Sequence, residues 1–397
     1  MFALRRASPP AGRESQPESG GRVDERRSSE DRVGNARDRR ARGEPRQAAS
    51  RGRQARRDRH RDSGRIRPDT ARFPGDARSR ERSMKVLKEI CSLERSSPGR
   101  TAVTIGVFDG LHIGHRNVIE RLLQVKRDEG MGASVLLTFD RHPLGVVRPE
   151  AMPPLLTTLD EKLSLLESTG VDYVCVMKFS RETASTDYRS FVRDTLIERL
   201  DMRHLVVGYD FHLGSGRAGS QELLREEGAR SGFGVTIVPP VVIGGRVVSS
   251  TKIRSAILGK NLGTAARFLG RAYFFDATVE RGSGIGKGMG FPTANLSISD
   301  PGKLVPPAAV YAVRVEPEGG RRYGGMMNIG SAPTLQGGGK RRIEVHLFGF
   351  DGDLYGRRVR VHCIRPLRKE KRFAGTDELK AQLMQDREKV MRILEKE

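Results

Sequence analysis

The segment Ala102-Val-Thr-Ile-Gly-Val-Phe-Asp-Gly-Leu-His-Ile-Gly-His115 determines the fold of the first half of this 397-residue chain. An apolar, β-branched run stops at Gly106, a glycine-containing turn follows, and His112 and His115 open a helical pattern. This order predicts a strand, a loop and a helix, with two imidazoles at the positive end of the helix dipole, where anions bind. Such imidazoles can hold phosphate oxygens as negative charge builds up, and the glycine between them lets a nucleotide approach the backbone. The alternative is a pair of surface histidines that caps the helix.

Apolar runs and amphipathic patterns alternate through the rest of the first half. Short apolar runs occur at 101–107, 133–139, 171–177, 204–208 and 234–243. Helical patterns lie between them at 115–129, 159–168, 187–200 and 219–231. Short apolar strands separated by helices predict a parallel sheet covered on both faces, in an α/β domain of the Rossmann-like type. Ligands of such folds bind beyond the carboxyl ends of the strands, and the polar motifs of this chain lie there.

The pattern changes after about residue 272. Alternating strands with Gly and Pro turns between them are expected at 274–280, 308–316, 322–330, 342–350 and 357–364. This pattern is typical of a small antiparallel β-barrel, and an amphipathic helix at about 376–395 closes the chain. The sequence therefore predicts a sheet domain at 84–259, a helical linker at 260–271 and a barrel domain with a C-terminal helix at 272–397.

The first 83 residues differ in composition from the rest of the chain. They contain 24 Arg, no Lys and 13 acidic residues, which gives +11 of the net charge of +23. We expect them to be disordered, because they have too few large apolar side chains to offset the entropy of ordering. An Arg-rich arm can bind nucleic acid through phosphates, but this one has many acids and no interleaved aromatic residues, so no specific nucleic-acid partner is expected. The alternative is that the true start is Met84.

Cysteine usage and hydropathy narrow the class of protein. Cys91, Cys175 and Cys363 are widely spaced and form no Cys-x-x-Cys motif, so neither a zinc cluster nor a disulfide framework is indicated. Cys175 and Cys363 lie in apolar, strand-like runs, where we expect them to pack in the core. No apolar stretch approaches the length of a membrane span, and no signal sequence is recognisable. We expect a cytoplasmic protein that does not interact with a membrane.

A second polar segment, Ser249-Ser-Thr-Lys-Ile-Arg254, is expected to start another helix. The helix N-terminus, the hydroxyls and the fork-shaped cation of Arg254 together could clamp a triphosphate. The alternative is an ordinary N-cap with a solvated Lys252 and Arg254.

Three single residues of the first half are also candidates. Asp210 directly follows an apolar strand and either holds a metal or a substrate or belongs to a turn. His142 precedes a proline at the end of another strand and is either a pocket residue or a surface residue. Arg217 follows Gly-Ser-Gly, from where it could reach a pyrophosphate.

The barrel half has a glycine-rich segment at 282–295. It is not a P-loop, because neither Ser nor Thr follows Gly286-Lys287. We expect backbone amides around Gly286-Lys287-Gly288 to wrap phosphates. Thr293 and Asn295 supply oxygen ligands of the kind that Mg²⁺ prefers.

Glu344 is the candidate general base of the barrel half. It alternates with Val345 in a strand pattern, so the two side chains face opposite ways. A carboxylate on the face opposite the core can take a proton from an alcohol. The alternative is an ordinary exposed glutamate on a strand.

The motifs of the first half together resemble a known family. His-x-Gly-His, Gly-Tyr-Asp-Phe-x-x-Gly-x-Gly-Arg and Ser-Ser-Thr-x-Ile-Arg, in this order, look like the FAD synthetase module of prokaryotic bifunctional riboflavin kinase/FAD synthetases. The resemblance implies direct adenylyl transfer from ATP to FMN, with His112 and His115 stabilising the transition state and Ser250, Thr251 and Arg254 holding the leaving phosphates. It implies that ATP is bound by Gly106, Phe108, Asp109, Gly110, His112, His115, Ser250, Thr251 and Arg254. It places His142, Asp210 and Arg217 on the flavin or metal side.

The motifs of the second half resemble the riboflavin kinase module of the same family. They are Phe-Pro-Thr-Ala-Asn295, Asn328-Ile-Gly and Gly-Asp-Leu-Tyr-Gly356. The resemblance, which covers about 100–397, implies that Mg²⁺-ATP phosphorylates the 5′-hydroxyl of riboflavin. Glu344 would be the base, Thr293 and Asn295 would bind Mg²⁺ and ATP, and Gly286, Lys287 and Gly288 would bind ATP. The metal and the backbone dipoles would then stabilise the negative charge of the phosphoryl group during transfer.

Two other functions are compatible with parts of this sequence. The first is a different cytidylyl- or adenylyltransferase with a barrel that only binds substrate, which Glu344, Thr293 and Asn295 argue against. The second is a nucleic-acid-binding protein in which the basic arm is the main functional element. It requires a chain starting at Met84 to lose the main activity.

Overall fold

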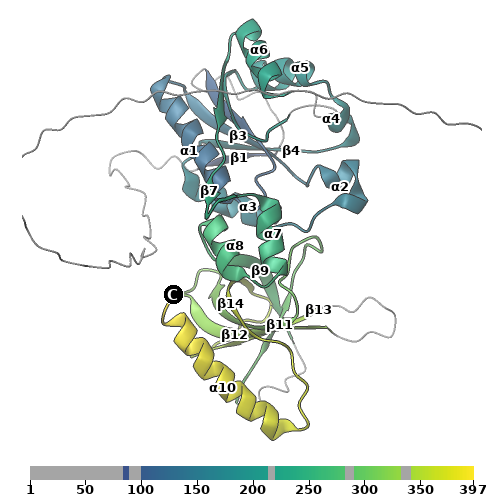
Figure 1. The fold of residues 1–397 in the computed structure, drawn as a ribbon, viewed down its shortest axis with the longest axis vertical. Coiled ribbons are helices and arrows are strands. Elements are labelled where there is room, and N and C mark those ends of the chain that lie inside the picture. The colour runs from purple at the N-terminus through teal and green to yellow at the C-terminus, as the bar shows by residue number, and fades with distance from the viewer. Residues whose placement is uncertain (1–83, 89–99, 213–219, 282–289, 332–340) are drawn as a thin grey trace, which may run out of the picture. The chain divides into compact units, whose positions relative to one another are not determined.

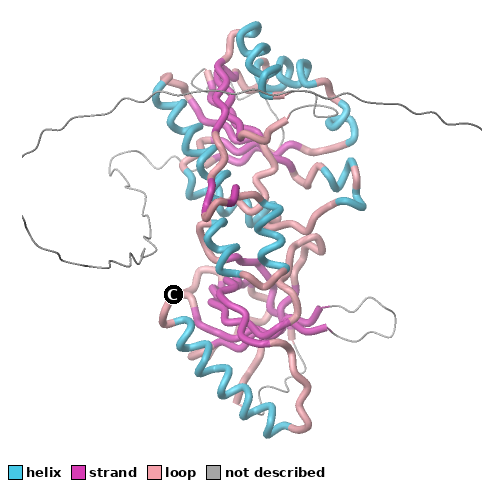
Figure 2. The backbone as a smooth tube through the Cα atoms, viewed as in Figure 1, coloured by secondary structure: helices cyan, strands magenta, loops and turns pink. Residues whose placement is uncertain are grey.

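The computed structural model describes residues 84–88, 100–212, 220–281, 290–331 and 341–397, which all belong to one compact unit. The predictions for the arm 1–83, Cys91, Arg217 and Gly286-Lys287-Gly288 lie outside the described residues. Figure 1 shows the order of the elements and Figure 2 their type along the backbone.

A six-stranded sheet in which every pairing is parallel forms the first half. In the spatial order β1-β4-β3-β2-β5-β6, its strands are Lys85–Leu87, Tyr173–Met177, Ala133–Phe139, Thr101–Ile105, Met202–Gly208 and Gly234–Val238. The predicted parallel sheet is confirmed. Strand β1 was not predicted, because three residues are too few to form a recognisable pattern. The carboxyl ends of β2, β3 and β5 meet at one edge, which brings the motifs that follow them together.

Helices cover both faces of the sheet, which explains why its strands are apolar throughout. Ala102 of β2 packs with helix α1 (Ile113–Asp128), and the next residue, Val103, packs with the opposite layer. That layer consists of α5 (Tyr188–Ser190), the π-helical segment η3 (Phe191–Ile197) and α6 (Gln221–Ser231). The single helix predicted at 187–200 is therefore divided into a short α-helical part, Tyr188–Ser190, and a π-helical part, Phe191–Ile197. The remaining helices before residue 240 are α2 (Leu144–Val147), η1 (Pro149–Ala151), α3 (Leu159–Leu166), η2 (Glu167–Thr169) and α4 (Arg181–Ser185).

The strand predicted at 234–243 ends at Val238 instead. Pro239 and Pro240 follow, and proline has no N–H to donate to a strand ladder. The chain then forms a short hairpin of β7 (Val242–Ile243) and β8 (Arg246–Val247).

Two helices connect the sheet to the barrel: α7 (Ser250–Leu258) and α8 (Leu262–Leu269). The second is the helix predicted within 260–271. Ile257 of α7 and Phe268 of α8 belong to the same buried cluster as Tyr273 and Phe275 of the barrel. The connecting helices therefore share the hydrophobic core of the second half.

The second half is a closed antiparallel barrel, as predicted. In the order β10-β13-β12-β11-β14-β9, its strands are Ala294–Ser297, Arg341–Leu347, Tyr323–Ser331, Ala309–Pro317, Arg358–Arg368 and Tyr273–Glu280. The sequence did not predict β10, which has four residues and begins within the end of the glycine-rich segment. It pairs with β9 and β13 and so closes the barrel.

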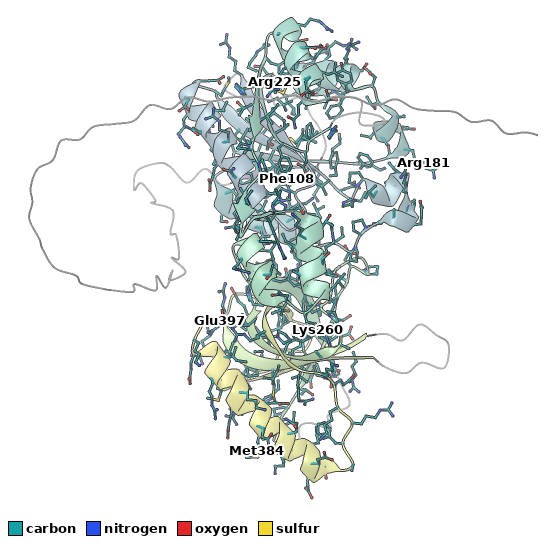
Figure 3. The ribbon with its side chains drawn as sticks, viewed as in Figure 1. Phe108, Arg181, Arg225, Lys260, Met384 and Glu397 are labelled. Atoms are coloured by element: carbon teal, nitrogen blue, oxygen red, sulfur yellow. The ribbon has the colours of Figure 1, made fainter. Side chains whose placement is uncertain are left out.

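The final helix α10 (Thr376–Leu394) packs on the outside of the barrel through Val390 and Leu394, against Ala312 and Met326. Met384, labelled on α10 in Figure 3, is exposed. Cys175 and Cys363 are buried in their strands, as predicted, and burial raises the pKa of the Cys363 thiol to about 12. Within the described ranges, no helix is long and apolar enough to cross a membrane.

Candidate functional site

The loop between β2 and α1 has an unusual backbone. Phe108, Gly110 and Leu111 all have positive φ, at 51°, 81° and 35°. A non-glycine residue in that region costs about 1–3 kcal/mol, which the surrounding structure must offset. Phe108 and Leu111 are both buried, so the apolar burial of their side chains supplies part of that stabilisation. Figure 3 labels Phe108 in the sheet half of the molecule.

The two histidines are stacked on each other at the start of α1. His112 is the N-cap, and its Nδ1 accepts a hydrogen bond from the backbone N–H of His115 at 3.2 Å. The ring centroids are 3.6 Å apart and the planes differ by 15°. A Cβ atom on Gly114 would lie 3.2 Å from the His112 ring. The glycine therefore makes room for the ring of His112, and the approach of a nucleotide to this backbone stays a prediction.

Both imidazoles are neutral at physiological pH. The pKa of His112 is lowered to about 4, mainly by burial; Asp109 opposes this shift, and Arg271 and Arg254 contribute to it. Burial, followed by the His112 ring, holds the pKa of His115 well below its usual value. Because Nδ1 of His112 accepts a hydrogen bond, we assign its proton to Nε2. Nε2–H is then a donor for an oxygen on which negative charge develops.

Asp109 and Arg254 form a buried ion pair behind the loop. The Nη2 atom of Arg254 lies 2.5 Å from Oδ2 of Asp109, and its Nε donates to the carbonyl of Pro154 at 2.7 Å. Asp109 also accepts from the N–H groups of Leu156 and Thr157. The ion pair joins two residues that are 145 positions apart in the sequence. The pair fixes the loop to α7, and a direct role of either residue toward ATP stays a prediction.

The start of α7 lies beside the same loop. Ser249 is the N-cap and accepts from the backbone N–H of Lys252, and Ser250 Oγ donates to the carbonyl of Asp109 at 2.9 Å. Thr251 is exposed. The structure thus brings the first turn of α7 to the loop that carries the histidines, as the clamp hypothesis requires. Lys252 donates to the carbonyl of Val247, so its ammonium group is held at the surface.

His142 and Asp210 lie after β3 and β5, the two strands that flank β2 in the sheet. Burial is the first cause of the lowered pKa of His142, and Asp109, Arg254 and Lys162 are the charges that act on it. These charges place His142 at the same edge of the sheet as the loop. Asp210 is exposed in the turn after β5, and the carbonyl of its main chain contacts His212 Nδ1.

Lys162 of α3 is a buried cation that sequence reasoning missed. Its Nζ donates to the carbonyls of Val107 and Phe139 and to Oγ1 of Thr138, so it binds the ends of β2 and β3. Burial lowers its pKa to about 8. An amphipathic helix pattern carries no signal for such a lysine, because most lysines on helices are exposed.

In the barrel, strand pairing aligns three polar residues. Asn295 of β10 pairs with Glu344 of β13, and Glu344 pairs with Asn328 of β12. Directly paired residues share one face of a sheet, so the three side chains form a row. Val345 is buried in the barrel core, which confirms that Glu344 faces the opposite way.

Two polar groups of the row, the carboxylate of Glu344 and the side-chain oxygen of Asn328, are placed as a substrate site would require. Arg342 Nη2 lies 2.8 Å from Oε1 of Glu344. The Oδ1 atom of Asn328 is buried and has no hydrogen-bond partner among the described residues, and such an atom is costly unless a ligand or water satisfies it. In the sequence Asn328 stands out only as part of the Asn328-Ile-Gly motif, because the row itself depends on strand register. Thr293, just before β10, is exposed.

Two family models match the chain, one for each half. The FAD synthetase model matches residues 94–252 and the riboflavin kinase model matches residues 269–394. The first match contains the loop with the histidines and the start of α7. The second contains the Asn295–Glu344–Asn328 row.

Curated relatives span both halves. The chain is 37% identical over 303 residues to the bifunctional riboflavin kinase/FMN adenylyltransferase of Escherichia coli K12, covering 76% of this chain and 96% of that protein. The proteins of the same name from Haemophilus influenzae and Bacillus subtilis are 34% and 32% identical over 303 residues, with 97% and 94% of their lengths covered.

A solved structure supports the arrangement of the fold. The crystal structure of a protein from Streptococcus pneumoniae, described as a macrolide-efflux protein, has a TM-score of 0.69 and 29% identity to this chain. It covers 77% of this chain and 98% of its own. The sequence relatives, their coverage and the two family models agree with the motifs and their geometry: the chain belongs to the family of bifunctional riboflavin kinases/FMN adenylyltransferases.

Proposed function

We propose that this protein converts riboflavin to FMN and then FMN to FAD, with ATP as the donor in both steps. The observation that carries the proposal is the pair of sites in one chain. Each site lies within the match to its own family model and contains the residue types that its reaction needs. The riboflavin kinase match over 269–394 also argues against a barrel that only binds substrate. Residues 84–259 would carry adenylyl transfer and 272–397 phosphoryl transfer, joined through 260–271.

In adenylyl transfer, a phosphate oxygen of FMN attacks the α-phosphorus of ATP. The new P–O bond forms as the bond to the β-phosphate breaks, and pyrophosphate leaves without a covalent enzyme intermediate. Neutral His112 and His115 donate N–H groups to oxygens whose charge grows in the transition state. The start of α7 offers Thr251 and free N–H groups to the leaving phosphates. His115 Nδ1 is buried and has no hydrogen-bond partner in the part of the chain that the structure describes, which is consistent with a site that a ligand completes.

The other predicted contacts of this site surround the histidines. Gly106, Phe108, Asp109 and Gly110 shape the loop on which ATP lies. Ser250 and Arg254 act through their bonds to Asp109. His142 and Asp210, and Arg217 outside the described residues, are proposed for the flavin or metal side.

In phosphoryl transfer, Glu344 accepts the proton of the riboflavin 5′-hydroxyl while that oxygen attacks the γ-phosphorus of ATP and ADP leaves. Thr293 and Asn295 are hard oxygen donors and fit Mg²⁺, which keeps several waters and binds substrate phosphates. Within the described residues, no group of three or more His, Cys, Asp or Glu could hold a metal ion, so an ion here relies on such neutral donors and on phosphate. Bound Mg²⁺ would neutralise charge on the phosphates.

The test is a time course with riboflavin and ATP, followed by separation of riboflavin, FMN and FAD. We expect FMN to appear first and FAD to follow, with pyrophosphate formed in equal amount to FAD. In Glu344→Gln, no FMN should form from riboflavin, whereas added FMN should still be converted to FAD. FAD formation without any FMN intermediate, or no flavin product at all from the folded protein, would overturn the proposal.

A further inference from the structure

A residue outside the sheet domain contacts the loop that carries the histidines. Arg271 follows α8 and lies within the riboflavin kinase match. Its Nη2 donates to the carbonyl of Gly110 at 2.7 Å, and its Nη1 donates to the carbonyl of Leu111 at 3.1 Å. The same Nη1 lies 3.3 Å from the carbonyl of Leu269. One guanidinium thus binds two consecutive carbonyls of the loop and joins them to the end of α8.

These two carbonyls belong to residues at positive φ. Gly110 and Leu111 directly precede His112, and both need contacts that hold an unfavourable backbone conformation. In a planar trans peptide the carbonyl and the following N–H point in opposite directions. Because the carbonyl of Leu111 points toward Arg271, the N–H of His112 in the same peptide points away from Arg271. Arg271 therefore sets the orientation of His112 at the start of α1.

The end of α8 is packed against α1 as well. A Cβ atom on Gly270 would lie 2.9 Å from Cγ2 of Ile113 and 3.9 Å from Nη1 of Arg116. Gly270 has φ of 71°, so this position combines left-handed backbone with a close approach. The contact is tight enough that a displacement of Arg271 would be transmitted to the first turn of α1.

Arg271 suits this task because its fork is planar and rigid. Two N–H groups of a guanidinium can reach two neighbouring acceptors at once, which one ammonium cannot do with the same geometry. Its Nε is buried without a hydrogen-bond partner within the described ranges, and the guanidinium lies 5.5 Å from the centre of the Phe274 ring. Burial lowers the pKa of Arg271 to about 9, so it is still a cation at pH 7.

We propose that Arg271 is a positioning residue for adenylyl transfer, holding Gly110 and Leu111 so that the imidazole of His112 meets the reacting phosphate. Arg271 touches the loop backbone and has no proposed contact with substrate. The proposal rests on the roles given above to His112 and His115. It implies that the polypeptide on the kinase side of the chain completes the adenylyl-transfer site.

The experiment measures both activities in the full chain carrying Arg271→Gln. We expect the kcat of FAD synthesis to fall by about tenfold to a hundredfold, since a misplacement of about 1 Å can cost that much. The KM values for ATP and FMN should change less than about threefold, and FMN formation from riboflavin should not change. Arg267→Gln is the matched control, because Arg267 is an exposed arginine on α8, four residues before Arg271, and its guanidinium donates to Oγ1 of Thr264. It should leave both activities unchanged.

A second variant, Arg271→Lys, keeps the charge but not the fork. We expect it to recover part of the kcat, and it serves as the main test if Arg271→Gln does not fold. Unchanged FAD synthesis in both variants, or an equal fall in both activities together with a lowered Tm, would overturn the proposal.

His112→Ala, measured alongside, separates this inference from the function on which it rests. If His112→Ala slows FAD synthesis and the Arg271 variants do not, only the positioning role is wrong. If His112→Ala has no effect, the proposed role of the histidines is wrong, and the positioning role of Arg271 is wrong with it.

Discussion

The two candidate sites are built in different ways. The adenylyl-transfer loop is irregular, with three residues at positive φ, and it is held by Thr157, Ser250 and Arg271, which lie 47 to 161 residues away from their partners. The kinase row consists of Asn295, Glu344 and Asn328 on regular adjacent strands, placed by backbone pairing alone.

This difference predicts which substitutions should lower the activity of each site. A strand ladder repeats, so a side chain on it keeps its place as long as the barrel forms. An irregular loop has no such repeat, and its conformation is stable only while distant groups satisfy its N–H and carbonyl groups. We therefore expect adenylyl transfer to respond to changes far from the reacting atoms, and phosphoryl transfer to respond mainly to changes in the row itself.

The largest effect should come from Glu344→Gln. Loss of a general base slows a reaction by about 10²–10⁴-fold, so FMN formation should nearly stop. The amide has almost the shape of the carboxylate, so the barrel should remain folded and FAD synthesis from added FMN should continue. Rates of both steps in one preparation provide the measurement. If both activities disappear while the protein stays folded, the two sites are not independent.

His115→Ala should slow FAD synthesis by about a hundredfold, which is the scale for loss of one donor to the transition state. Riboflavin phosphorylation in the same sample is the internal control and should be unchanged. His115 is half-buried and stacks on His112, so a thermal melt is needed to show that the variant folds. Normal FAD synthesis would assign this imidazole to packing against His112 alone.

Asn295→Ala tests whether the row binds the metal and nucleotide. We expect the Mg²⁺ concentration for half-maximal kinase activity to rise by about tenfold, because a hard oxygen ligand is lost. The Mg²⁺ dependence of FAD synthesis should stay as in the wild type. Identical titrations of the kinase step in both proteins would make Asn295 a structural residue of β10.

The smallest effect concerns stability and involves one histidine from each half. Burial lowers the pKa of His112 and of His362 to about 4, below the 6.5 of an unfolded chain. Below pH 6.5 the unfolded state binds protons that the folded state does not, so the free energy of unfolding falls until about pH 4 and is fully retained above 6.5. At pH 5.5 each histidine should cost roughly 1.4 kcal/mol, about tenfold in the folding equilibrium.

The measurement for this prediction is Tm at pH 7.5 and pH 5.5. His362→Gln should reduce the drop in Tm on acidification, and the wild type should show the full drop. An equal drop in both proteins would show that His362 is not protonated on unfolding in this range.

Local patterns in the sequence predicted most of the architecture. The β-branched run before Gly106, the helix that follows and the alternation around Glu344 depend on neighbours two to four residues apart, so they are visible in the chain itself. The parallel sheet, the barrel and α10 followed from them. The motifs also carried the family resemblance, and with it the two reactions.

Short elements and long-range contacts could not be predicted in this way. Strands β1 and β10 have three and four residues, and pairing with neighbours stabilises them rather than their own sequence. Chain packing brings the guanidinium of Arg254 to Asp109, buries Lys162 and places Asn328 beside Glu344. Residues 16 to 145 positions apart leave no periodic signal when they meet. The sequence by itself determined which chemical groups the protein has and the elements that carry them; the tertiary structure decided which groups are paired, buried or left open, because desolvation and hydrogen bonding depend on neighbours that only folding brings together.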